Sequence, residues 1–112
     1  MAFTNEKLSN IVVVTSGNNA GIATVESSKK VFIRSIMAYD VAGAAATASV
    51  YVVPNGESLG TSNKLFNISL NTQETALLEP IYPIVLDTTG DKIFVEADGG
   101  TVNFFITGDR EA

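Results

Sequence analysis

Short runs of β-branched and aromatic residues alternate with turn residues along the chain, and no segment keeps helical spacing over three turns. The turns carry the Gly, Asn, Asp and Pro residues that tight corners require. Strands are therefore predicted over Ile11–Thr15, Ile22–Val25, Val31–Tyr39, Ala46–Val53, Lys64–Leu70, Thr75–Leu78, Ile84–Leu86, Lys92–Ala97 and Val102–Thr107. Such even spacing is typical of a β-sandwich or a barrel.

Within several runs the apolar residues recur at every second position, which is the period that buries one face of a strand. On this ground the predicted core includes Val50, Phe66, Ile68, Val95 and Phe104. We expect an all-β fold, a single antiparallel β-sandwich of jelly-roll-like or Ig-like topology, formed by residues 11–112.

One long run changes its parity, because Val31 and Ile33 share one face whereas Ile36 and Ala38 share the other. An extra residue in the strand would bring all four side chains to the same side. The sequence thus predicts a β-bulge at Arg34-Ser35.

The last two runs flank Asp98-Gly99-Gly100-Thr101, and this short glycine-containing turn predicts a β-hairpin. The same glycines do not suit a phosphate-binding loop. Such a loop leads into the N-terminus of a helix, whereas this chain is expected to return as a strand.

Residues 1–10 lie outside the strand pattern. Phe3 and Leu8 are the only large apolar side chains there besides Met1. Chain termini are loose unless something holds them. We expect residues 1–10 to form an extended N-terminal arm that grips a neighbouring subunit through Phe3 and Leu8, and the alternative is a disordered tail.

The composition argues against most enzymatic chemistry. The chain has no Cys, no His and no Trp among its 112 residues. Without His it lacks the commonest general base and the commonest transition-metal ligand. A Ser–Lys pair within Ser27-Ser28-Lys29-Lys30 is better explained as a polar turn. The segment Asp87–Asp91 offers only two carboxylates to a cation and does not match a calcium loop. We predict no catalytic residue, no cofactor and no metal.

The charge pattern narrows the choice of partners. Seven basic and 12 acidic residues give a net charge of -5, which is not the basic footprint of a nucleic-acid or anionic-membrane binder. The uncharged stretch from 41 to 56 is too short to cross a bilayer. Charged residues make up only 17% of the chain, against about 25% in an average domain. This low charge favours a surface covered by partner subunits, and hence a homo-oligomer.

Three tyrosines are the remaining candidates for recognition. Tyr39, Tyr51 and Tyr82 could stack on a sugar ring, as the aromatic residues of carbohydrate-binding modules do. An amphipathic tyrosine is equally suited to a protein interface or to ordinary packing. We therefore treat all three, with Phe3 and Leu8, as candidate partner-binding residues.

Residues 30–109 resemble a family of small all-β virion structural proteins of tailed bacteriophages. The motifs that carry the resemblance are Val31-Phe32-Ile33-Arg34-Ser35-Ile36, Ala42-Gly43-Ala44-Ala45-Ala46, Ala48-Ser49-Val50-Tyr51-Val52-Val53-Pro54-Asn55-Gly56, Lys64-Leu65-Phe66-Asn67-Ile68, Glu74-Thr75-Ala76-Leu77-Leu78, Leu86-Asp87-Thr88-Thr89-Gly90-Asp91-Lys92-Ile93-Phe94-Val95 and Val102-Asn103-Phe104-Phe105-Ile106-Thr107-Gly108. These motifs are architectural and contain no catalytic signature.

The resemblance implies a location in the virion and a non-enzymatic structural role. The expected function is that of a capsid decoration or cement protein, which binds the lattice of the major capsid protein or other virion proteins. A trimer would suit the local threefold positions of an icosahedral shell. The alternative is a tail-, neck- or head-fibre-associated binding module that contacts a host surface glycan.

Overall fold

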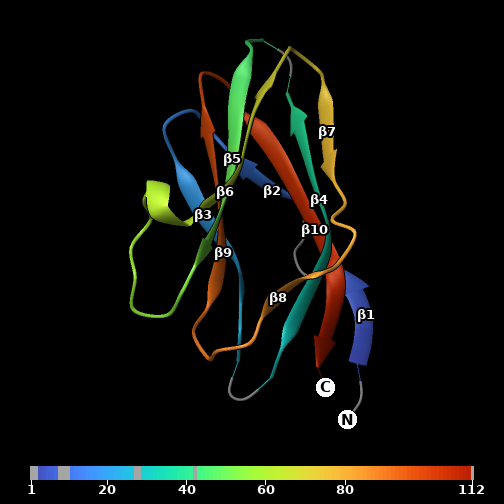
Figure 1. Cartoon of the computed structure of the whole chain (residues 1–112). Coiled ribbons are helices and arrows are strands. Elements are labelled where there is room, and N and C mark those ends of the chain that lie inside the picture. Colours follow the sequence, from blue (N-terminus) through green and yellow to red (C-terminus); the bar gives the residue numbers. More distant parts are fainter. Residues whose placement is uncertain (1–2, 8–10, 27–28, 42, 112) are drawn as a thin grey trace.

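The computed structural model describes residues 3–7, 11–26, 29–41 and 43–111, which form ten strands and one short 3-10 helix. The elements are β1 (Phe3–Lys7), β2 (Val12–Val14), β3 (Asn19–Thr24), β4 (Val31–Asp40), β5 (Ala46–Val53), η1 (Thr61–Asn63), β6 (Lys64–Leu70), β7 (Thr75–Leu78), β8 (Ile84–Leu86), β9 (Lys92–Asp98) and β10 (Val102–Glu111). The strands form two antiparallel sheets that pack face to face, with β3, β9, β5 and β6 in one and the other six in the second (Figure 1). The predicted antiparallel β-sandwich is confirmed.

The order of the strands identifies a jelly roll. In the six-stranded sheet, β1 and β2 lie end to end along one edge of β10, whose other edge pairs with β4. Strands β7 and β8 likewise lie end to end along the far edge of β4. Each sheet therefore has four strand positions, and the four-stranded sheet has the order β3-β9-β5-β6. Eight positions in two antiparallel sheets, with repeated crossings between them, are the architecture of the jelly roll.

The predicted hairpin at the end of the chain is wrong. Strand β9 belongs to the four-stranded sheet and β10 to the six-stranded sheet, so the turn between them crosses from one sheet to the other. A short glycine turn between two alternating runs indicates a change of direction. It does not say whether the second strand pairs with the first or packs against it.

The core lies between the sheets and follows the predicted parity. Val50, Val95 and Phe104 are fully buried. Phe66 and Ile68 pack against the core but remain partly exposed. Their strand, β6, is at the edge of its sheet and is covered on one side only.

The predicted β-bulge is present and corrects the parity of β4. Thr107 of β10 lies opposite Ser35, but the next residue, Gly108, lies opposite Ile33, so Arg34 is the extra residue. Both halves of β4 therefore bury their apolar side chains. Gly108 makes the bulge possible, because a Cβ atom at this position would overlap the main-chain carbonyl oxygen of Phe32.

Two regular segments were not predicted. Residues 3–7 form β1, paired with residues 107–111 of β10 in the same chain, where an arm reaching towards a neighbour was expected. Strand β10 also continues beyond the predicted end at Thr107 as far as Glu111. Pairing with β1 on one edge and β4 on the other keeps this polar segment extended. That residues 1–10 grip a neighbouring subunit stays a prediction.

Phe104→Ala should lower the free energy of unfolding by about 3–5 kcal/mol, since it removes a fully buried aromatic ring and leaves a cavity. Denaturant titration of the two proteins measures the difference. A change smaller than about 1 kcal/mol would contradict the inward placement of this side chain.

Gly108→Ala should destabilise the fold by on the order of 3 kcal/mol, because the new methyl group meets main chain that cannot rotate away. Gly60→Ala is the matched control: Gly60 has an extended backbone, with φ at -171°, and open space where the Cβ would lie. Thermal and denaturant unfolding should separate the two variants clearly. Equal stability of both would show that the bulge tolerates a side chain at position 108.

Candidate partner-binding face

The polar groups on the outer face of the four-stranded sheet, which surround the apolar Phe94, are hydrogen-bonded to one another. The Ser49 hydroxyl donates a hydrogen bond to Asn67 Oδ1 at 2.7 Å. The Tyr51 hydroxyl donates to Glu96 Oε1 at 2.7 Å, and Lys64 Nζ lies 5.5 Å from the centre of the Tyr51 ring. Because these groups already have partners within the chain, this face offers little that a binding partner could gain.

Tyr51 is an integral part of that network. Its side chain is only 5% exposed although it points away from the core. Burial, followed by the hydrogen bond and the charge of Glu96, raises the pKa of Tyr51 to about 12 from an ordinary value of 10.0. The phenol is therefore held in its neutral, donating form.

The outer face of the six-stranded sheet is different, because apolar side chains stand on it. Met37 of β4 lies opposite both Phe105 of β10 and Leu77 of β7. Met37 and Leu77 are 40% and 51% exposed. The exposed and half-buried apolar residues on this side of the sheet form the apolar face, which consists of Ile11, Val13, Met37, Tyr39, Leu77, Val85 and Phe105. Met37, Leu77 and Phe105 are direct neighbours across three strands, and contiguous apolar surface marks a binding site more often than scattered exposed residues do.

A shallow hollow of about 350 Å³ lies within the apolar face. Its lining includes Ile11, Met37, Tyr39, Phe105 and Asn103. The side-chain oxygen of Asn103 is buried there and has no hydrogen-bond partner within the described chain. The hollow thus combines mainly apolar walls with a few polar side chains, Asn103 and Thr75 among them, which is the usual composition of a small recognition pocket.

A proline-flanked bulge extends the apolar surface at the sheet edge. Leu78 pairs with Ile36 and Ile84 pairs with Ile33, so five residues of the edge, 79–83, stand opposite only two of β4. The extra residues of this segment therefore project from the sheet. Among them are Ile81, which is 94% exposed, and Tyr82, which is 83% exposed. Pro80 and Pro83 bound this segment and cannot donate ladder hydrogen bonds.

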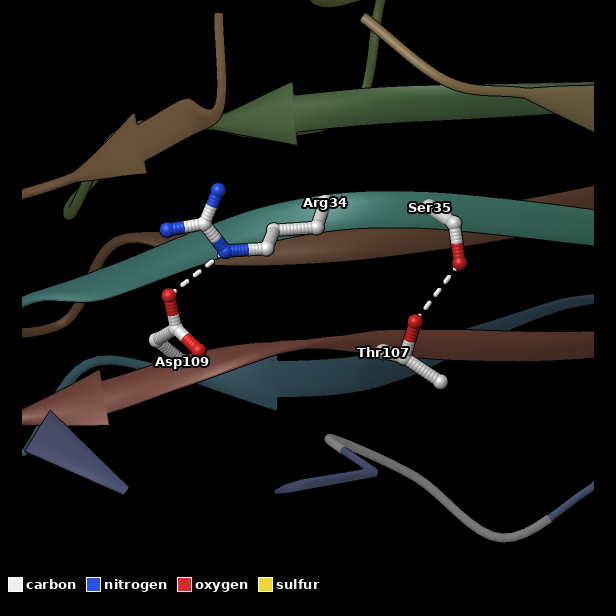
Figure 2. A network of polar contacts seen from close by, with 4 residues as sticks. All are labelled: Arg34, Ser35, Thr107 and Asp109. Atoms are coloured by element: carbon white, nitrogen blue, oxygen red, sulfur yellow. Dashed lines mark hydrogen bonds and ion pairs between the residues drawn. The ribbon is translucent and has the colours of Figure 1, made fainter. Parts of the chain in front are cut away.

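Two polar contacts cross the middle of the same sheet, between β4 and β10 (Figure 2). Arg34 Nε lies 2.6 Å from Asp109 Oδ2, and Ser35 and Thr107 share a hydrogen bond of 2.6 Å between their hydroxyls. Both contacts flank the β-bulge. They connect β4 to β10 beside the bulge. The charge of Arg34 is paired with that of Asp109, so this pair adds no net charge to the surface.

The five predicted partner-binding residues do not gather at one place. Tyr39 lines the hollow and Tyr82 stands at the edge of the same sheet, whereas Tyr51 lies on the opposite face. Phe3 is in β1, and its side chain, like the whole of Leu8, is outside the described residues.

Sequence reasoning missed the main constituents of the apolar face. Met37, Leu77 and Val85 stand at outward positions of predicted strands, and an apolar residue at an outward position was the available signal. Met37 follows the bulge by two residues, so its direction depends on where the extra residue lies.

The segment Asp87–Asp91, which offers two carboxylates, forms a hydrogen-bonded turn. Asp91 Oδ1 accepts a bond from the Asn55 amide at 3.0 Å, and Asp91 Oδ2 accepts one from the Thr88 amide at 3.2 Å. In the described part of the chain, no three His, Cys, Asp or Glu side chains are grouped so that they could hold a metal ion. Among the same residues, no helix has the length and apolarity needed to cross a membrane.

Comparison with known proteins shows the fold. No protein-family model and no curated protein matches the sequence. A chain of the T13 IBDV viral particle superposes on 97% of this chain with a TM-score of 0.55 and 9% identity, but this chain spans only 30% of that one. A chain of infectious bursal disease virus strain Gx matches 97% of this chain and 31% of its own length, with 11% identity and a TM-score of 0.49.

A second kind of similar structure comes from Bacillus endospore appendages, which form disulfide-linked pili. The match covers 99% of this chain and 88% of the appendage chain, with a TM-score of 0.50 and 14% identity. This chain has no cysteine and cannot form such links. These likenesses establish a jelly-roll fold shared with a viral-particle chain and a spore-appendage chain.

Tyr51 should contribute to the pH dependence of stability above pH 10. The unfolded chain releases this proton near pH 10.0, while the folded chain retains it to about 12, so the contribution is complete below pH 10 and is lost as the pH rises through 12. The difference in unfolding free energy between the parent and Tyr51→Phe should therefore shrink between about pH 9 and about pH 11.5. A difference that stays constant would contradict the raised pKa.

Proposed function

We propose that this chain is a non-enzymatic structural protein of a virion, specifically a capsid decoration protein that binds the lattice of the major capsid protein. The observation that carries the proposal is the contrast between the two outer faces. One face carries polar side chains that are hydrogen-bonded to one another, and the other exposes Met37 and Leu77 beside an apolar hollow. A surface protein of a shell needs one face for solvent and one for the lattice.

The make-up of the apolar face supports a protein partner. Aromatic residues and methionine are enriched at protein interfaces, while lysine and glutamate are depleted there. The face contains Tyr39, Phe105 and Met37, and an ion pair that crosses the sheet joins Arg34 to Asp109. An interface centred on Met37 and Phe105 would thus be apolar there, and it need not bury an unpaired charge from the neighbouring Arg34–Asp109 pair.

Self-association belongs to the same proposal. Homo-oligomers are usually symmetric, and a trimer would suit the local threefold positions of an icosahedral shell. The low content of charged residues, 17%, supports a chain whose surface is partly covered by other subunits.

A second candidate is a glycan-binding module of a tail, neck or head fibre. The observation in its favour is Tyr82, whose side chain is 83% exposed on a proline-bounded bulge. An aromatic ring presented in this way can stack on a sugar. Loss of glycan binding in Tyr82→Ala, with an unchanged amount of the chain on the particle, would favour this function over decoration.

The test uses purified particles of the virus that encodes this chain. Quantitative mass spectrometry should find the chain in an amount comparable to the shell protein. An amount that is a small fraction of the shell protein would support a tail or neck location, and absence from particles would overturn the proposal.

A matched pair of variants then tests the surface. Leu77→Asp places one charge on an edge strand of the apolar face, and Ser69→Asp places one on an edge strand of the other sheet. On particles stripped of this chain, Leu77→Asp should bind at least about tenfold more weakly, or about 1.4 kcal/mol, and Ser69→Asp should bind like the parent. Equal binding of the two variants would contradict the proposed surface.

A further inference from the structure

The N-terminal strand is attached to the rest of the molecule differently from the strand that follows it. Both β1 and β2 pair with the same edge of β10. Strand β2 also contacts β3 and β9 of the opposite sheet, and its Val14 is buried in the core. For β1, β10 is the principal neighbour, and β1 lies at the margin of its sheet, away from β3 and β9 (Figure 1). The described backbone thus shows β1 attached through its pairing with β10.

The sequence of β1 favours an attachment weaker than that of the long central strands. Its five residues are Phe-Thr-Asn-Glu-Lys, and Phe3 is the only large apolar residue among them. Hydrophobic burial is the main force that holds strands together, and an isolated two-stranded pairing is marginal in water. Pairing of β1 with β10 should thus open and close far more readily than the pairing of β4 with β10.

When β1 leaves, residues 107–111 of β10 become an open edge with unpaired amide and carbonyl groups, which is a template for another strand. The strand that fits this edge in register is already known. Thr4 pairs with Arg110 and Lys7 with Thr107, and every other copy of the chain carries the same strand.

The connection between β1 and β2 has length to spare. Lys7 pairs with Thr107 and Val12 with Phe104, so five steps of the chain connect two points that are three steps apart along β10. Three steps along a strand cover about 10 Å. Five steps of extended chain can cover about 18 Å, so β1 could reach a different β10 that lies close beside its own.

We propose that β1 is exchanged between copies: in the assembled protein, β1 of one copy pairs with β10 of its neighbour in the register seen within a single chain. The exchange preserves all five residue pairs of this ladder. It adds a link between neighbours at little cost, which is the usual basis of domain swapping. The inference rests on the proposed function only in that it requires copies to assemble side by side.

The absence of cysteine from the chain makes a direct test possible. Facing residues of an antiparallel pair are close enough for a disulfide. Thr4→Cys and Arg110→Cys are made in two separate chains carrying different tags, mixed at high concentration and oxidised. The expected result is a disulfide-linked heterodimer, at least tenfold more abundant than in a control mixture of Thr47→Cys and Asp98→Cys. The control residues pair in the interior of the other sheet, between β5 and β9.

The double variant Thr4→Cys, Arg110→Cys completes the test. It should form an intrachain disulfide when dilute and interchain disulfides when concentrated. Intrachain disulfides alone at every concentration, with no heterodimer above the control, would overturn the exchange, and so would the absence of any disulfide between positions 4 and 110. Because the measurement uses the isolated protein, its failure would leave the proposed location in the virion untouched.

Discussion

The bulge at Arg34 is the constraint on which the six-stranded sheet depends. Strands β4 and β10 are its two longest strands, and each is paired on both edges. Without the extra residue, one half of β4 would turn its apolar side chains to the outside. The bulge needs a partner without a side chain, which Gly108 supplies, and it places Arg34 and Ser35 beside Asp109 and Thr107. The inner packing and the outer polar contacts of this sheet thus have one common cause.

The same alternation that builds the core determines what each outer face can do. Outward positions of β5 and β6 carry Ser49, Tyr51 and Asn67, which are hydrogen-bonded within their own sheet. Outward positions of β4 and β7 carry Met37 and Leu77, which have no polar group to satisfy and remain exposed. The two outer faces of this jelly roll therefore differ in chemistry although one rule of alternation produces both.

Much of the fold could be predicted from the sequence because its signals are local. Period-two alternation identified Val50, Val95 and Phe104 as core residues, and the change of parity after Ile33 located the bulge. Other features depend on contacts between distant segments. Whether β9 and β10 pair, and whether the polar residues after Thr107 stay extended, is decided by β1, β4 and β5 and not by the residues themselves.

The candidate binding face was harder to predict from the sequence for the same reason. Tyr51 follows the core residue Val50, so alternation places it on the outer face, but alternation does not show that Glu96 and Lys64 surround it. Equally, Met37, Leu77 and Phe105 come from three separate strands, and only the register of β4 with its two neighbours brings them together. A surface patch assembled across strands leaves no contiguous motif in the chain.

Cryo-electron microscopy of the assembled particle would show whether the six-stranded sheet contacts its partner through the apolar face. The density should place this chain with Met37, Leu77 and the hollow beside Tyr39 against the shell, and with Ser49 and Asn67 towards solvent. Density in which the polar face of the four-stranded sheet contacts the shell, while the apolar face is open to solvent, would contradict this placement.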